Sequence, residues 1–126
     1  MNLKLFCITL NPVNLKTINN LNLIPVGLGD KNFSKEWLQD KEGKSIASKN
    51  NFYGEYTFHY WIWKNYLNHL GDSWIGFCQY RKFWSYNEKK NNNINDLASL
   101  KKEIISNHLP SRFDSYESIL GEPIYT

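Results

Sequence analysis

Two apolar-rich segments joined by Gly71-Asp72-Ser73 constrain the fold of this chain more than any other feature. The first, residues 53–70, is crowded with aromatic side chains and would span roughly 27 Å as a helix at ~1.5 Å per residue. The second, residues 74–81, would span roughly 26 Å as a strand at ~3.3 Å per residue. Matched lengths and a short link predict that the start of the helix and the end of the strand meet at one edge of a sheet. Open α/β folds bind ligands at that edge.

Other periodic segments complete an α/β pattern. The expected elements are a strand at 4–10 stopped by Asn11-Pro12, a short helix at 14–20, a strand at 23–29, the helix and strand described above, and a helix at 94–107. The last helix is predicted from apolar residues at helical spacing, namely Leu97, Leu100, Ile104 and Ile105. The polar stretch 32–49 is expected to be a long surface loop, of the kind that often binds ligands or acts as a lid.

This order of elements predicts an α/β fold with a mostly parallel sheet flanked by helices. A chain of 126 residues holds one domain with a real core, so residues 1–126 are expected to form a single domain. A sheet of about three strands has open edges and a poorly covered face. We therefore expect an incomplete domain that exposes apolar surface and could self-associate through it.

Composition excludes several classes of protein. No apolar run approaches the ~20 residues of a membrane span, and residues 1–10 lack a small-residue cleavage site, so a cytoplasmic location without a transmembrane segment is expected. The net charge is only +3, and Lys and Asn are enriched in a way that AT-rich codons explain. Without a basic block or a recognisable nucleic-acid module, no nucleic-acid partner is expected.

The two cysteines, Cys7 and Cys78, lie in strand-like apolar runs. Free cysteines in such runs behave as small buried hydrophobes, so reduced thiols are expected. A disulfide stays possible if the two strands are parallel neighbours. No Cys/His spacing resembles a zinc site.

Three segments resemble the bacterial family called domain of unknown function 4422. They are Ile24-Pro25-Val26-Gly27, the run from Ile46-Ala47-Ser48-Lys49-Asn50 through Tyr53-x-Glu55-x-Thr57-x-x-Tyr60-Trp61-x-Trp63-Lys64-Asn65, and Trp74-Ile75-Gly76-Phe77-x-x-Tyr80-Arg81-Lys82-Phe83. The resemblance covers residues 4–83 and, more loosely, the rest. Two positions depart from the family pattern: the family's strand end usually reads His-Tyr-Arg-Arg where this chain has Gln79 first, and the family tends to carry a His where this chain has Leu10.

The resemblance implies a glycosyltransferase-like protein of capsular and exopolysaccharide gene clusters. It implies a GT-A-like fold whose first half binds a nucleotide sugar, with a carbohydrate as acceptor. Family members are longer, so this chain is expected to be the donor-binding half and to transfer no sugar alone. The alternative is a non-catalytic carbohydrate- or nucleotide-binding module, or a truncated inactive remnant.

The strand end is the first part of the predicted binding site. Transfer from a nucleotide sugar releases a diphosphate, whose charge must be neutralised. The chain has no Asp-x-Asp pair to hold a metal, so metal-independent binding without a cofactor is expected. Arg81 and Lys82, next to Gln79 and Tyr80, could supply the positive charge instead. The plain alternative is a solvated basic turn.

The helix start is the second part. Lys49 and Asn50 precede the expected helix, where free N–H groups favour phosphate, although Asn50 would also serve as an N-cap. Tyr53 could stack on a base or sugar, or pack in the core. Glu55 is a binding candidate, and His59 lies four residues later, where the two are expected to form a structural pair. No catalytic base is identified.

Overall fold

The computed structural model describes residues 2–85 and 96–121. The strands are β1 (Leu3–Thr9), β2 (Ile24–Gly27) and β3 (Trp74–Gln79), and the α-helices are α1 (Leu15–Asn20), α2 (Asn50–Tyr53), α3 (Tyr56–Trp61) and α4 (Leu97–Glu103). Short 3-10 turns are η1 (Pro12–Asn14), η2 (Ala47–Lys49), η4 (Leu67–His69) and η5 (Ser111–Phe113), and η3 (Ile62–Tyr66) is a π-helical turn. Within this described part of the chain, no helix is long and apolar enough to cross a membrane.

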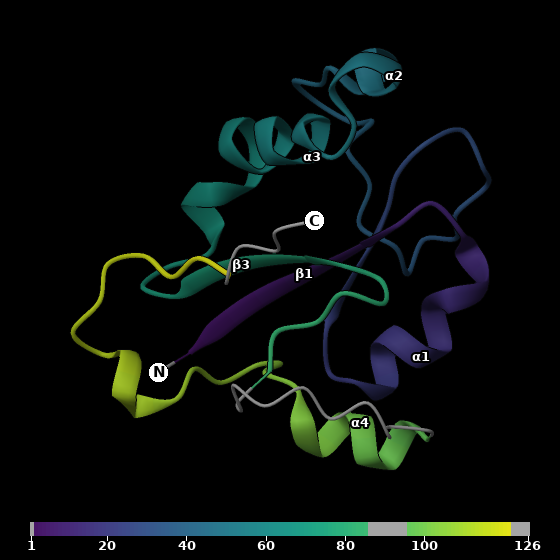
Figure 1. Cartoon of the computed structure of the whole chain (residues 1–126). Coiled ribbons are helices and arrows are strands. Elements are labelled where there is room, and N and C mark those ends of the chain that lie inside the picture. Colours follow the sequence, from purple (N-terminus) through teal and green to yellow (C-terminus); the bar gives the residue numbers. More distant parts are fainter. Residues whose placement is uncertain (1, 86–95, 122–126) are drawn as a thin grey trace.

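The three strands form a parallel sheet in the order β2-β1-β3, which confirms the predicted α/β class. The chain leaves the central strand β1 toward one side to form β2, and then crosses to the other side to form β3. In Figure 1, α3 lies above the sheet, and α1 and α4 lie below it. The two crossovers therefore run on opposite faces, as in doubly wound α/β folds.

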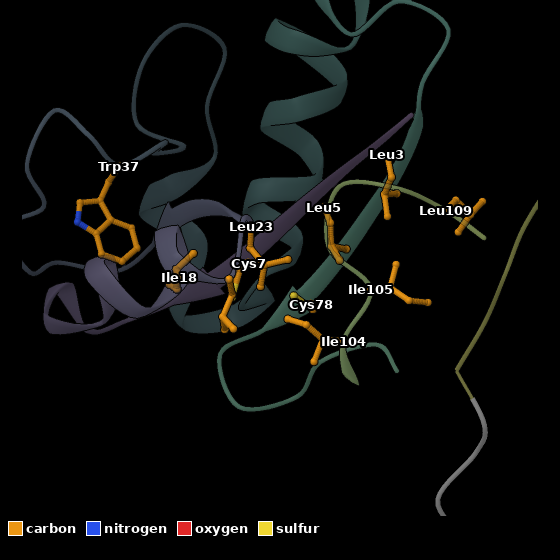
Figure 2. Packing of buried hydrophobic residues seen from close by; sticks show 11 residues of the cluster. Leu3, Leu5, Cys7, Ile18, Leu23, Trp37, Cys78, Ile104, Ile105 and Leu109 are labelled. Atoms are coloured by element: carbon orange, nitrogen blue, oxygen red, sulfur yellow. The ribbon is translucent and has the colours of Figure 1, made fainter. Parts of the chain in front are cut away.

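Alternate residues of β1 are buried in two different cores. Leu5 and Cys7 face the core between the sheet and helices α1 and α4, where Figure 2 shows them near Cys78 and Ile104. Phe6 lies on the opposite face, in a cluster with Phe58 and Trp61 of α3. Its ring meets Phe58 edge-on, with ring centroids 5.5 Å apart. Both faces of the central strand are thus covered, and the sheet is held between two layers of helices.

The continuous helix predicted for residues 53–70 is wrong, because the segment bends at Gly54. This residue has φ 54° and ψ −131°, a conformation that only glycine adopts at low cost. It separates α2 from α3 and makes an elbow between them. After α3 the backbone widens into η3 and then tightens into η4, so it reaches β3 as a chain of short helical turns.

The long loop at 32–49 is attached to the helical segment rather than free. Three side chains spaced four residues apart bond to it: Thr57 Oγ1 donates to Asp40 Oδ2 (2.6 Å), Trp61 Nε1 to Glu42 O (2.7 Å) and Asn65 Nδ2 to Lys44 O (2.7 Å). Asn65 also accepts from the Lys44 amide at 3.0 Å. This part of the resemblance motif, Thr57-x-x-x-Trp61-x-x-x-Asn65, therefore holds the loop in place.

The same loop covers one edge of the sheet. Leu38 forms a parallel bridge with Val26: its N–H donates to Pro25 O (3.0 Å), and its carbonyl accepts from Gly27 N (2.9 Å). The β2 edge, expected from the strand count to be open, is thus paired at this point. Trp37, 5 % exposed, packs with α1 in the lower core and fixes the loop from its other side.

The helix predicted for residues 94–107 is shorter in the structure. Residues 94 and 95 lie outside the described residues, and α4 ends at Glu103. Ile104 is extended, with φ −94° and ψ 152°, and bridges Ser85. Ile105 N donates to Trp84 O at 2.8 Å. The two β-branched residues pair as extended chain and bury their side chains against the sheet, which outweighs the helical spacing.

Cys7 and Cys78 are register partners on the neighbouring strands β1 and β3. Both are buried free thiols, in agreement with the reduced state favoured by the sequence. A hydrogen bond between the two thiols, together with burial, raises the pKa of Cys78 far above its ordinary value. The pair is therefore inert packing on the lower face and not a source of thiolate.

The buried hydrogen bond between Thr57 and Asp40 gives a stability prediction. Both residues are buried, and Asp40 is only 2 % exposed. Thr57→Val keeps the shape of the side chain but removes the hydroxyl that Asp40 accepts from. It should lower the free energy of unfolding by about 1–3 kcal/mol, measured by urea denaturation. Thr57→Ser keeps the hydroxyl and serves as the control. A valine variant as stable as the serine variant would show that this bond does not anchor the loop.

Candidate functional site

A cleft of about 470 Å³ opens at the carboxyl edge of the sheet. This volume falls within the usual range for small-molecule sites. Three segments line it: the link from β1 to η1 (Thr9, Leu10, Asn11, Asn14), the α2–α3 elbow (Asn50, Gly54, Glu55) and the end of β3 (Gln79, Tyr80, Arg81), over an apolar floor of Ile8 and Leu28. The cleft lies between β1 and β3, where the chain changes direction across the sheet. Doubly wound folds bind ligands at this switch point.

The end of β3 turns sharply at the mouth of the cleft. Lys82 N donates to Gln79 O at 2.9 Å, which closes a four-residue turn. Arg81 is the third residue of that turn and has φ 77°. This is the left-handed position of a type II turn, which glycine usually occupies. An arginine there costs of order 1 kcal/mol or more, and such strain is concentrated at functional sites.

The elbow contributes the only carboxylate among the described residues that line the cleft. Glu55 Oε2 accepts from Gln79 Nε2 at 2.8 Å, so the start of the helical segment does meet the strand end, as the matched lengths predicted. Because α2 and α3 are single short turns of four and six residues, neither supplies the macrodipole of a long helix. The elbow therefore contributes to the cleft through its side chains and not through a helix dipole.

Asn50 does not cap the N-terminus of the helix, contrary to one of the two interpretations of this residue. The turn η2 precedes it, and its Nδ2 donates to Gly54 O (3.0 Å) and Thr57 Oγ1 (3.3 Å). The Asn50 side chain thus closes α2 at its C-terminal end. It also joins the cleft to the buried Thr57–Asp40 pair.

The link from β1 to η1 holds cleft residues that the sequence analysis missed. Thr9 Oγ1 accepts from Asn11 N (3.1 Å) and donates to Asn14 Oδ1 (2.9 Å), while Asn11 Oδ1 accepts from Val13 N (3.2 Å). The available signal was Asn11-Pro12 directly after a buried strand, which we interpreted only as a strand stop. A polar turn at that point of a parallel sheet is also a binding position.

The structure divides the predicted site residues into two groups. Asn50, Glu55, Gln79, Tyr80 and Arg81 line the cleft, whereas Lys49, Tyr53 and Lys82 are exposed and lie outside its lining. Tyr53 is 52 % exposed, so it is not a core residue either. Leu10 and Gln79, the two positions that depart from the family pattern, both line the cleft.

His59 does not line the cleft and does not form the expected hydrogen-bonded pair with Glu55. Its ring packs on Phe77, with centroids 4.2 Å apart, and its Nε2 is buried without a hydrogen-bond partner in the described part of the chain. Burial lowers the pKa of His59, and the nearby charge of Glu55 only partly opposes this shift. The Glu55 carboxylate accepts from Gln79 instead.

Across residues 2–85 and 96–121, no group of three or more His, Cys, Asp or Glu side chains is arranged to hold a metal ion. The charged groups of the cleft lining are Glu55 and Arg81. Most of its other polar groups are side-chain amides, which bind neutral hydroxyl, amino and carbonyl groups. The arrangement is suited to a polar organic ligand with an anionic end near Arg81.

The chain belongs to the family described as domain of unknown function DUF4422, whose model matches residues 4–124. The match includes every residue that lines the cleft. No curated protein matches the chain, and no solved structure does.

The buried Nε2 of His59 gives a prediction for pH. Because the pKa of His59 is lower in the folded chain than its ordinary value of 6.5, the unfolded chain binds the proton more tightly. The contribution of neutral His59 to stability is therefore fully present above its ordinary pKa of 6.5, and it is lost as the pH falls toward the lower pKa of the folded chain. Urea denaturation between about pH 7.5 and 5.5 should show this loss, and His59→Gln should reduce it. An unchanged pH dependence in the glutamine variant would assign the effect to other groups.

Proposed function

We propose that this member of the DUF4422 family binds a nucleotide sugar in the cleft and serves as the donor-binding part of a glycosyltransferase. The proposal includes a GT-A-like fold and a role in the biosynthesis of capsular or other surface polysaccharide. The observation that carries it is Arg81, held in a strained turn at the mouth of a switch-point cleft. A solvated basic turn would not need arginine in a position where glycine is more stable.

The chemistry of the lining supports a nucleoside diphosphate as ligand. Arg81 can donate two parallel hydrogen bonds to phosphate oxygens and stabilise the negative charge that develops on a leaving diphosphate. Glu55 and the neighbouring amides can accept from ribose hydroxyls. Tyr80 and the apolar floor provide the surface on which a ring can pack. Lys49 and Lys82, outside the lining, would add only screened positive charge.

Aromatic residues around the elbow support a carbohydrate acceptor. Phe52 and Tyr56 are 86 % and 66 % exposed, on the short helices that flank Gly54 and Glu55. Aromatic faces pack on the apolar faces of sugar rings and lose little entropy on binding. An acceptor bound at these rings would approach the cleft from the side of α2.

A second candidate is a binding module that does not transfer sugar. It is favoured because Glu55, the only carboxylate of the lining, is hydrogen-bonded to Gln79, and because His59 lies outside the lining. Both facts leave the described residues of the cleft without an obvious general base. Release of free nucleoside diphosphate from a nucleotide sugar, with and without oligosaccharide acceptors, separates the two candidates. Binding without release would favour the module.

Binding is proposed to need no metal. With Arg81 supplying the charge that many GT-A enzymes take from a divalent ion, affinity for a nucleoside diphosphate should be the same in EDTA and in magnesium or manganese. Isothermal titration calorimetry of the whole chain in each buffer tests this. Strict dependence on a metal would contradict the proposal and indicate that carboxylates such as Asp30 or Glu55 act as ligands.

The arginine itself provides the sharpest test of the proposed function. Arg81→Gly should weaken binding of a nucleoside diphosphate by about 1.5–3 kcal/mol, the range for hydrogen bonds to a charged group, or roughly 10- to 150-fold. The free energy of unfolding should stay within about 1 kcal/mol of the parent, since relief of strain offsets the added freedom of the unfolded chain.

Lys82→Ala is the matched control, because it removes a neighbouring positive charge that lies outside the lining. Its effect on affinity should be small, about 0–1 kcal/mol, as for exposed charges. Equal losses in the two variants would mean that the turn contributes only diffuse charge. Unchanged affinity in folded Arg81→Gly would exclude Arg81 as a phosphate ligand.

A further inference from the structure

We infer that the cleft selects a nucleoside whose base presents carbonyl oxygens, as uracil does, to the β1–η1 link, and whose ribose donates to groups on the opposite side. The inference rests on the proposed nucleotide binding and extends it by naming the base. It follows from the hydrogen bonds that four side-chain amides of the lining make within the protein.

The β1–η1 side of the cleft is a donor wall, formed by Asn11 and Asn14. The backbone N–H of Val13 can only donate, so it fixes Oδ1 of Asn11 as the acceptor at 3.2 Å. The Thr9 hydroxyl accepts from Asn11 N and donates to Asn14 Oδ1. Each amide oxygen thus accepts a bond within the turn, and neither NH₂ group has a partner among the described residues, so both can donate to a ligand in the cleft.

The opposite side is an acceptor wall, formed by Asn50, Glu55 and Gln79. The Gly54 carbonyl can only accept, so it fixes Nδ2 of Asn50 as the donor, and the second bond of that NH₂ goes to Thr57. The Glu55 carboxylate likewise fixes Nε2 of Gln79 as a donor. The amide oxygens of Asn50 and Gln79 and the Glu55 carboxylate therefore present acceptors to the ligand.

Arg81 sets the direction of the ligand between these walls. It lies in the turn after β3, so the diphosphate belongs at that end and the base belongs at the β1–η1 link. The ribose between them carries hydroxyl donors, which match the acceptor wall. At the donor wall uracil offers two carbonyl oxygens and no exocyclic amine. Cytosine and adenine would place an amine donor against NH₂ donors and leave the donors on both sides unpaired.

The experiment compares affinities of the whole chain for UDP, CDP and ADP by isothermal titration calorimetry. The parent should bind UDP roughly ten-fold or more tightly than CDP, from the cost of an unpaired polar group. Asn11→Asp and Asn14→Asp each keep the oxygen that holds the turn but lose the NH₂ donor. Each should bring the UDP-to-CDP affinity ratio to about one or below, because a carboxylate accepts from the amine of cytosine.

Several controls keep the inference falsifiable. UDP and CDP carry the same charge, so the ratio is insensitive to the negative charge that each aspartate adds. Asn19→Asp makes the same change on an exposed residue of α1 outside the lining and should leave the ratio unchanged. Thermal denaturation should show Asn11→Asp folded, since aspartate caps η1 equally well.

Two failures can be told apart. Equal affinity of the parent for UDP, CDP and ADP, or a ratio that the Asn11 and Asn14 variants leave unchanged, would overturn the selection of the base while nucleotide binding stands. No measurable binding of any of the three nucleotides by the folded chain would overturn the proposed function, and this inference with it.

Discussion

The position of β1 is the constraint on which the rest of the structure depends. The strand is hydrogen-bonded to β2 on one edge and to β3 on the other, and its side chains are buried alternately against α3 and against the layer of α1 and α4. Because described residues occupy both edges and both faces of β1, a ligand can approach the strand at its carboxyl end. The cleft forms there, where the β1–η1 link, the elbow and the turn after β3 converge.

The sequence predicted the parts of the site that follow from length and direction. A helical segment and a strand of similar length, joined by a short link, were expected to bring Glu55 and Gln79 to one edge of the sheet. The hydrogen bond between the two side chains confirms this. It did not predict the break at Gly54, since a glycine within a helical pattern does not reveal its φ and ψ. The extended pairing of Ile104 and Ile105 was missed for a related reason. Burial of these side chains against the sheet outweighed the helical spacing of the apolar residues in this segment.

The amides of the cleft show why the remainder of the site could not be predicted. Asn occurs so often in this chain that its frequency gives no reason to select any one of them as a site residue. What distinguishes Asn11, Asn14 and Asn50 is which end of each amide is already bonded within the protein. That depends on the backbone path of two tight turns, and no pattern of residue types records it. Lys49 and Lys82 were predicted from their charge, and both lie outside the lining of the cleft.

The loop at 32–49 has a consequence for how the chain tolerates change. Length and polarity make it look like a permissive place for an insertion, a tag or a deletion. In the structure, Leu38 pairs with β2, Trp37 is in the lower core, and Asp40, Glu42 and Lys44 are bonded to the helical segment. Removing it would uncover the N–H and C=O groups of β2, and an uncovered strand edge is a template for pairing with other molecules. By pairing with β2, the loop keeps this strand edge from pairing with other molecules. The exposed link at Gly71-Asp72 is the safer place to join a second protein.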